Sequence, residues 1–103
     1  MKKYDKLVRD RIPEILSLKG IEHTTHTVLG DDFRDYLSKK LEEEVNEFIE
    51  NPCLEELADI QEVVYGILSA YDWSASSLKA TADEKRNDKG GFSGAVILKE
   101  VLG

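Results

Sequence analysis

Two apolar repeats, one directly after the other, constrain the fold of this chain more than any other feature. In residues 32–50, apolar side chains recur every three or four positions, the spacing of one helix face: Phe33, Leu37, Leu41, Val45, Phe48 and Ile49. The same spacing returns after Asn51-Pro52, in a second set of apolar side chains: Leu54, Leu57, Ile60, Val64, Ile67, Leu68 and Tyr71. Because so short a connection makes neighbouring helices antiparallel, residues 32–71 predict a helical hairpin.

The start and end signals around these repeats predict where the helices begin. Asp31-Asp32 is expected to cap the first long helix, and Asn51 to cap the second, with Pro52 at its first position. Gly66, inside the second helix, is unfavourable there by about 1 kcal/mol relative to alanine. It therefore indicates that another group approaches the backbone at this point.

Shorter elements flank the hairpin and complete an all-α fold. Residues 11–19 predict a short helix with a proline in its first turn, ending at Gly20. Ser74 is expected to cap a polar helix over residues 75–89, which Gly90 closes. Residues 21–29 are rich in β-branched side chains and indicate an extended segment or a weak strand. The apolar tail, residues 92–102, is expected to dock on another surface.

Composition predicts one folded domain spanning residues 1–103. Apolar residues make up 41% of the chain and charged residues 34%, enough apolar material for a core. No segment approaches the roughly 20 apolar residues of a membrane span, and no signal-peptide pattern follows the first residues. We therefore expect a cytoplasmic protein that does not bind membranes. The single cysteine, Cys53, cannot form an internal disulfide and is expected to be buried.

The net charge of −7 narrows the range of partners. An acidic surface repels the phosphates of nucleic acid polymers, so such polymers are not expected as ligands. If the chain binds a phosphorylated small molecule, a divalent cation has to offset the repulsion.

Two pairs of acidic residues on the predicted hairpin are the candidates for a functional site. Glu44 and Glu47 are three residues apart, as are Glu56 and Asp59, so each pair shares one helix face. Folding the hairpin between Asn51 and Pro52 places Glu47 opposite Glu56 and Glu44 opposite Asp59. The sequence therefore predicts that four carboxylates converge.

These acidic residues border the apolar face rather than the opposite one. Glu44 lies three residues after Leu41 and four before Phe48, which places it toward the core. Like charges beside apolar packing repel unless a cation neutralises them. A set of carboxylates without His or Cys suits Mg²⁺, or Mn²⁺, rather than zinc.

A second interpretation is a glutamate-rich helix surface that serves only solubility. Spacing alone does not decide between this interpretation and a metal site. The acidic residues on the outer face are assigned to solvent: Glu42, Glu50, Glu55 and Glu62.

The acidic motif resembles that of the all-α nucleoside triphosphate pyrophosphohydrolases, the MazG-like superfamily, whose signature is E-E-x-x-E followed by E-x-x-D. Here it reads Glu43-Glu44-Val45-Asn46-Glu47 and then Glu56-Leu57-Ala58-Asp59. The separation between its two halves is shorter than in MazG itself. Residues 5–13 and 89–92 are similar to the phosphoribosyl-ATP pyrophosphohydrolase-like branch, so the resemblance spans nearly the whole chain.

The resemblance implies hydrolysis of a nucleoside triphosphate, including non-canonical ones, to a monophosphate and pyrophosphate. It implies Mg²⁺ ligation by Glu44, Glu47, Glu56 and Asp59, with Glu43 assisting the attacking water. It also implies a homo-oligomeric helical bundle, either a dimer or a tetramer. Phosphoribosyl-ATP hydrolysis and a non-catalytic dimerisation or metal-sensing module remain as alternatives.

Basic residues near both ends of the chain are candidates for contacts with a nucleotide. Arg9, Lys85 and Arg86 are predicted to contact phosphates, with ordinary surface charge as the alternative interpretation. His23 and His26 lie in a threonine-rich segment without a partner pattern and are assigned no role.

Overall fold

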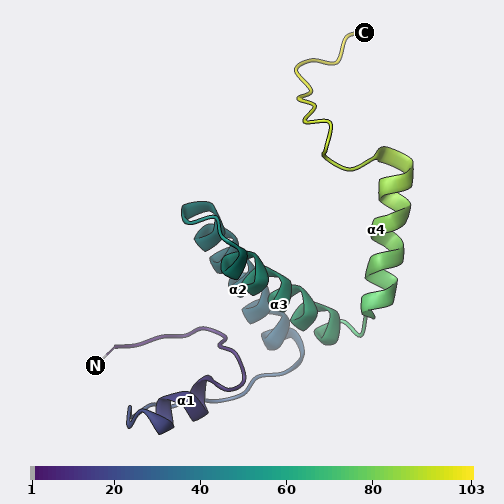
Figure 1. The fold of residues 1–103 in the computed structure, drawn as a ribbon. Coiled ribbons are helices and arrows are strands. Elements are labelled where there is room, and N and C mark those ends of the chain that lie inside the picture. The colour runs from purple at the N-terminus through teal and green to yellow at the C-terminus, as the bar shows by residue number, and fades with distance from the viewer. Residues whose placement is uncertain (1) are drawn as a thin grey trace. The chain divides into compact units, whose positions relative to one another are not determined.

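The computed structural model describes residues 2–103 and is all-helical in that range, without strands. The predicted fold class, all-α, is thereby confirmed. Figure 1 shows the four helices: α1 (Ile12–Leu18), α2 (Gly30–Glu50), α3 (Leu54–Ala70) and α4 (Ala75–Lys89). Within this described range, no helix combines the length and apolar character needed to cross a membrane.

Helices α2 and α3 lie side by side and make the main helix–helix contact (Figure 1). Their shared core is formed by Leu37 of α2 with Val63 and Leu68 of α3, which are 3%, 7% and 8% exposed. At Gly66, a Cβ atom would lie 2.9 Å from Cδ2 of Leu37. The prediction that another group approaches the backbone at Gly66 is therefore confirmed, and that group is the most buried leucine of α2.

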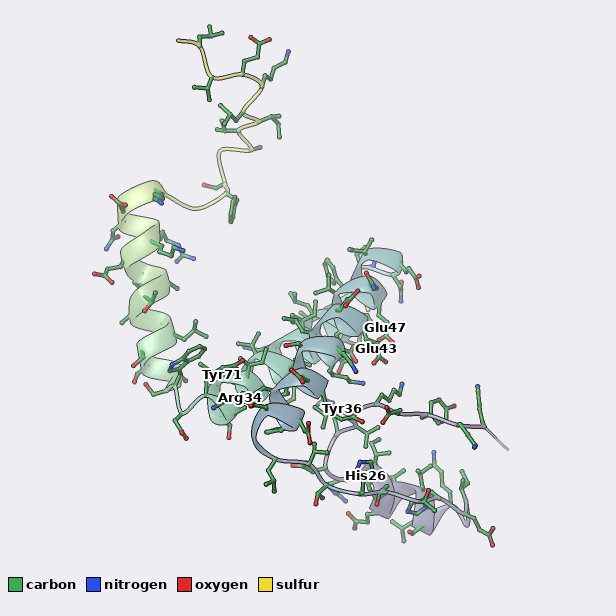
Figure 2. All side chains as sticks on the ribbon, turned by 180° about the vertical axis from the view of Figure 1, so that it is seen from behind. His26, Arg34, Tyr36, Glu43, Glu47 and Tyr71 are labelled. Carbon is green, nitrogen blue, oxygen red and sulfur yellow. The ribbon has the colours of Figure 1, made fainter. Side chains whose placement is uncertain are left out.

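Arg34 ties the beginning of α2 to the end of α3. Its Nε and Nη2 atoms donate to the carbonyl oxygen of Ala70 at 3.2 and 3.1 Å, and its guanidinium lies 4.5 Å from the ring centroid of Tyr71. Arg34 and Tyr71 are labelled together in Figure 2. Because the last carbonyls of a helix have no partner within it, this contact satisfies one of them and complements the helix dipole.

The predicted caps of the two long helices were wrong. Helix α2 is preceded by Leu29 as its N-cap, and Asp31 and Asp32 lie inside its first turn, where their charges favour the helix dipole instead of capping it. Asn51 closes α2, its amide donating to the carbonyl of Glu47 at 3.0 Å. Pro52 and Cys53 follow Asn51, and α3 begins only at Leu54.

Cys53 is the N-cap residue of α3, and its side chain makes no capping hydrogen bond to the helix. The thiol is free and half-buried, whereas the sequence predicted it to be buried. Its place at the start of the helix explains its partial exposure.

The first helix follows its prediction closely. Helix α1 has a proline in its first turn and ends before Gly20, whose φ of +71° is the left-handed conformation that glycine adopts without strain. Residues 21–29 form no regular element. The weak strand considered for this segment is absent, since the described chain offers no second strand to pair with it.

The chain divides after Asp72, and the second unit is Trp73–Gly103. As predicted, Ser74 caps α4, its Oγ accepting from the amide of Ser77 at 3.0 Å, and Gly90 ends it with a φ of +85°. Residues 92–102 form no helix or strand, and their apolar side chains are exposed, with Phe92 99% accessible. Docking of this tail on another surface stays a prediction.

Candidate metal centre

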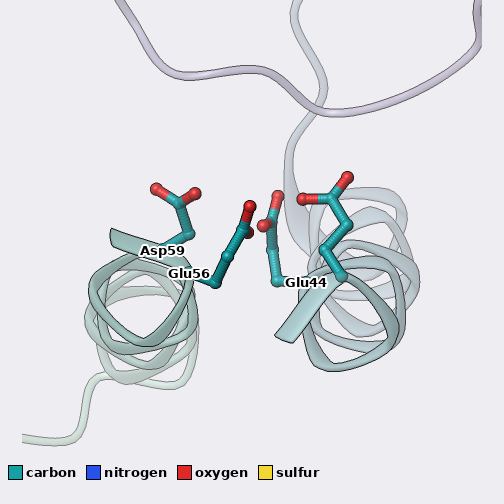
Figure 3. A group of neighbouring side chains, drawn as sticks. Glu44, Glu56 and Asp59 are labelled. Atoms are coloured by element: carbon teal, nitrogen blue, oxygen red, sulfur yellow. The ribbon is translucent and has the colours of Figure 1, made fainter. Parts of the chain in front are cut away.

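The structure brings the four predicted acidic residues together. Glu44 and Glu47 come from α2, and Glu56 and Asp59 from α3; one carboxylate oxygen of each lies within 4.8 Å of the others. In Figure 3, Glu44 and Glu56 meet between the two helices, and Asp59 lies beside them and points to the same side. We call these four residues the acidic cluster. The predicted convergence across the α2–α3 contact is thereby confirmed as geometry.

Helical spacing explains how the acidic cluster forms. Within each helix, two acidic residues three positions apart occupy the same face, and the packing of α2 on α3 turns both faces toward one another. Glu44 is only 6% exposed, while the other three members are intermediate in burial. The acidic residues predicted to face solvent do so: Glu42, Glu50, Glu55 and Glu62 are exposed.

Two oxygens of the acidic cluster are buried without a hydrogen-bond partner: Oε2 of Glu44 and Oε2 of Glu56. Leaving a buried polar atom unsatisfied destabilises a fold by about 1–3 kcal/mol, and by more when the group is charged. Such atoms are rare in native proteins and require an explanation. Here both belong to carboxylates at the centre of the cluster, where a cation would satisfy them.

Lys40 is the fixed counter-ion of the acidic cluster. Its ammonium lies 3.3 Å from Oε1 of Glu44 and 3.5 Å from Oε2 of Glu43, and its side chain is only 15% exposed. Burial, and next a hydrogen bond with Glu47, raise the pKa of Glu44 in spite of Lys40. One lysine therefore does not neutralise the cluster. Lys40 was not among the predicted site residues, although its position four residues before Glu44 is the spacing of a helical ion pair.

The segment formed by residues 5–9, here called the N-terminal strap, supplies two further cations. Arg9 Nη2 lies 2.7 Å from Oδ1 of Asp59, and Lys6 Nζ lies 3.1 Å from Oε1 of Glu43. Asp5 accepts a hydrogen bond from the hydroxyl of Tyr36, which raises the pKa of that hydroxyl. The purple N-terminal trace runs past the cluster in Figure 3.

Glu43 lies beside the acidic cluster but is not one of its four members. Partial burial acts to raise the pKa of Glu43, but the hydrogen bond from Lys6 and the charges of Lys40 and Lys6 outweigh it and lower the pKa. Glu43 is therefore a carboxylate that stays ionised. Its predicted role in assisting an attacking water is compatible with that charge but is not tested by it.

The predicted nucleotide contacts fall into two groups. Arg9 reaches the acidic cluster directly. Lys85 and Arg86 lie on α4, in the unit that contains no member of the cluster. Their contact with a nucleotide stays a prediction.

The donor set of the acidic cluster fits a hard divalent cation. Its ligands are carboxylate oxygens alone, which favour Mg²⁺ or Mn²⁺ over zinc. The two unpartnered oxygens, one of them on a residue more than nine-tenths buried, supply unused acceptor capacity. The four residues could therefore hold a metal ion.

No protein-family model, curated protein or solved structure matches this chain.

Proposed function

We propose that this chain is a Mg²⁺-dependent nucleotide pyrophosphohydrolase and that the acidic cluster holds the cation. The observation that carries the proposal is the pair of buried, unpartnered oxygens of Glu44 and Glu56 within a group of four converging carboxylates. An acidic patch that served only solubility would instead point its charges into water. The resemblance of the acidic motif to the MazG-like pyrophosphohydrolases supports the choice of reaction.

A polyphosphate substrate accounts for an acidic site on an acidic protein. The chain carries a net charge of −7, so it repels a nucleoside triphosphate unless a cation lies between them. Bound Mg²⁺ supplies charge stabilisation to the phosphoryl group and lowers the pKa of an attacking water. Mn²⁺, which prefers similar oxygen ligands, is the expected substitute.

The remaining roles belong to residues around the acidic cluster. Glu43 is ionised at neutral pH and directly precedes Glu44 in the sequence, so we assign to it the role of orienting a water or accepting its proton. Arg9 is the strongest candidate for a phosphate contact because its guanidinium already reaches Asp59. Lys85 and Arg86 are further candidates on α4.

The proposal includes an antiparallel α2–α3 hairpin as the core of a homo-oligomeric helical bundle. Several apolar side chains of α3 are exposed, among them Leu54 at 78% and Leu57 at 49%. They line a shallow hollow of about 400 Å³ together with Ala58, Ile60 and Val64. A second copy of the chain would cover this apolar surface.

The experiment that tests the activity is a pyrophosphate-release assay on a panel of nucleoside triphosphates with Mg²⁺. Glu44→Gln removes a proposed ligand with little change in shape, while Glu42→Gln makes the same change at an exposed position of α2. Changes beside a metal site already lower affinity or activity by about 10- to 100-fold, so loss of a ligand is expected to lower turnover by at least about a hundredfold. The control should keep wild-type activity.

Three results would count against this function. They are no pyrophosphate release from any nucleotide, release without a divalent cation, or equal activity of Glu44→Gln and Glu42→Gln. Circular dichroism of each variant separates loss of activity from loss of the fold.

A further inference from the structure

The N-terminal strap is attached by polar contacts to both helices that form the acidic cluster, α2 and α3. Asp5 accepts from Tyr36, and Lys6 is paired with Glu43, both partners lying on α2. Arg9 is paired with Asp59 of α3 at 2.7 Å. Only this last contact engages a proposed metal ligand, so Arg9 and a cation require the same carboxylate.

The counter-ions Lys40 and Arg9 differ in how freely they can move. Lys40 is on the same helix as Glu44, and its side chain is 15% exposed. Arg9 comes from a segment fifty positions away from Asp59, and its side chain is 56% exposed. Arg9 can therefore leave Asp59 by rotating its side chain, whereas Lys40 remains packed beside the cluster.

The backbone around Arg9 is held in place independently of its side chain. The carbonyl oxygen of Arg9 accepts from the amide of Ile12 at 3.0 Å, at the start of α1. The contacts of Asp5 and Lys6 hold the other end of the strap. If the guanidinium leaves Asp59, it therefore stays next to the acidic cluster, where the phosphates of a metal-bound substrate would lie.

We propose that Arg9 exchanges partners: it neutralises Asp59 while the acidic cluster is empty, and it binds a substrate phosphate once a divalent cation occupies the cluster. This inference rests on the proposed function. A cation at the cluster repels the guanidinium and takes over Asp59, while the planar guanidinium fork matches a phosphate group as well as it matches a carboxylate. The exchange couples the two ligands, so phosphate strengthens cation binding and cation strengthens phosphate binding.

The test compares Arg9→Gln with Arg11→Gln. Arg11 is 77% exposed and paired only with Glu14, three residues away, so its variant makes the same charge change without touching the acidic cluster. Titration calorimetry with Mn²⁺ alone measures the affinity of the acidic cluster for the cation, for which Arg9 competes through its ion pair with Asp59. Because an exposed ion pair is removed as a competitor, Arg9→Gln should bind Mn²⁺ about two- to fivefold more tightly than wild type.

The second measurement uses inorganic tripolyphosphate with saturating Mg²⁺, which contains the phosphates but no base or sugar. A hydrogen bond to a charged group is lost in Arg9→Gln, so affinity should fall by roughly tenfold or more. Arg11→Gln should match wild type in both titrations. An exchange predicts opposite changes in Arg9→Gln: tighter binding of Mn²⁺ and weaker binding of Mg²⁺–tripolyphosphate. An arginine with a merely structural role would not produce this combination.

Each remaining outcome overturns the exchange. It fails if Arg9→Gln behaves like Arg11→Gln, if both affinities change in the same direction, or if wild type does not bind Mg²⁺–tripolyphosphate. If the wild type binds Mn²⁺ but the affinities of Arg9→Gln do not change in the two expected directions, the metal centre is supported and the exchange is refuted. If wild type binds no divalent cation, the exchange and the proposed function fail together. Circular dichroism of Arg9→Gln verifies that its helix content equals that of wild type.

Discussion

Glu44 is the residue at which the demands of folding and of the proposed metal centre conflict most. Its side chain is buried beside Lys40, yet one of its oxygens has no partner. Burial, followed by the hydrogen bond with Glu47, raises its pKa. The folded chain therefore holds the proton of Glu44 to a higher pH than the unfolded chain does, and ionisation of this carboxyl group opposes folding.

This residue gives a prediction about stability and pH in the absence of metal. As pH rises from the ordinary glutamate value of 4.5 through the raised pKa of folded Glu44, the wild-type protein loses this contribution to its free energy of unfolding. Glu44→Gln is neutral throughout. It should therefore be more stable than wild type at neutral pH, with the difference vanishing at about pH 4.

Urea unfolding with a chelator present, at both pH values, measures the difference. Glu42→Gln, at an exposed position, should show little change at either pH. An advantage of Glu44→Gln that is the same in acid and at neutral pH would contradict the assignment of the effect to ionisation of Glu44.

Single residues also show which part of the site the sequence could predict. The acidic cluster followed from spacing, because three-residue intervals on paired helices fix which side chains meet. The contact of Arg9 with Asp59 joins residues fifty positions apart through a segment without regular structure, and no periodic pattern encodes such a contact. The ion pair of Lys40 with Glu44 could have been predicted from helical spacing, whereas the contacts of the N-terminal strap could be identified only in the folded structure.

At the scale of elements, the contact of α2 with α3 depends on the small size of Gly66. Replacing this glycine by alanine favours an isolated helix by about 1 kcal/mol, but the new Cβ would lie 2.9 Å from Leu37 Cδ2. Leu37 is 3% exposed and has little room to move, and overpacking a core costs about 1–3 kcal/mol. The repulsion should outweigh the gain in helix propensity.

We therefore expect Gly66→Ala to lower the free energy of unfolding by roughly 1 kcal/mol. Leu37→Val removes the clashing atom, so in that background Gly66→Ala should be neutral or stabilising. Chemical denaturation of wild type, the two single variants and the double variant forms the cycle that isolates the contact. A destabilisation of equal size in both backgrounds would show that Leu37 is not the cause.

Elements were predicted better than their ends. Apolar periodicity located the long helices, and Ser74 and Gly90 were correctly placed at the ends of α4. The caps of α2 and α3 were wrong because a cap depends on the direction in which the chain enters the helix. Pro52 and Cys53 lie in the connection before α3 begins at Leu54, and sequence preference alone placed the start of α3 at Asn51-Pro52.

At the scale of the whole molecule, the described chain leaves much apolar surface uncovered. Its buried apolar side chains are Leu37, Val63 and Leu68 only, and all three belong to the unit that ends at Asp72. In the other unit, the tail exposes Phe92 at 99% and Val96 at 87%. Small domains bury a limited share of their surface, and exposed apolar patches of this kind mark interaction sites.

The last prediction is that the chain associates with itself through the hollow on α3. Light scattering at micromolar concentration should give a mass that is a multiple of 11.6 kDa. Leu57→Arg places a charge in the hollow, where burial against a partner would be unfavourable, and should shift the mass toward that of the monomer. Ser69→Arg adds the same charge at an exposed position of α3 outside the hollow and should leave the mass unchanged. A wild-type mass of 11.6 kDa would rule out self-association, and equal dissociation by both variants would place the interface elsewhere.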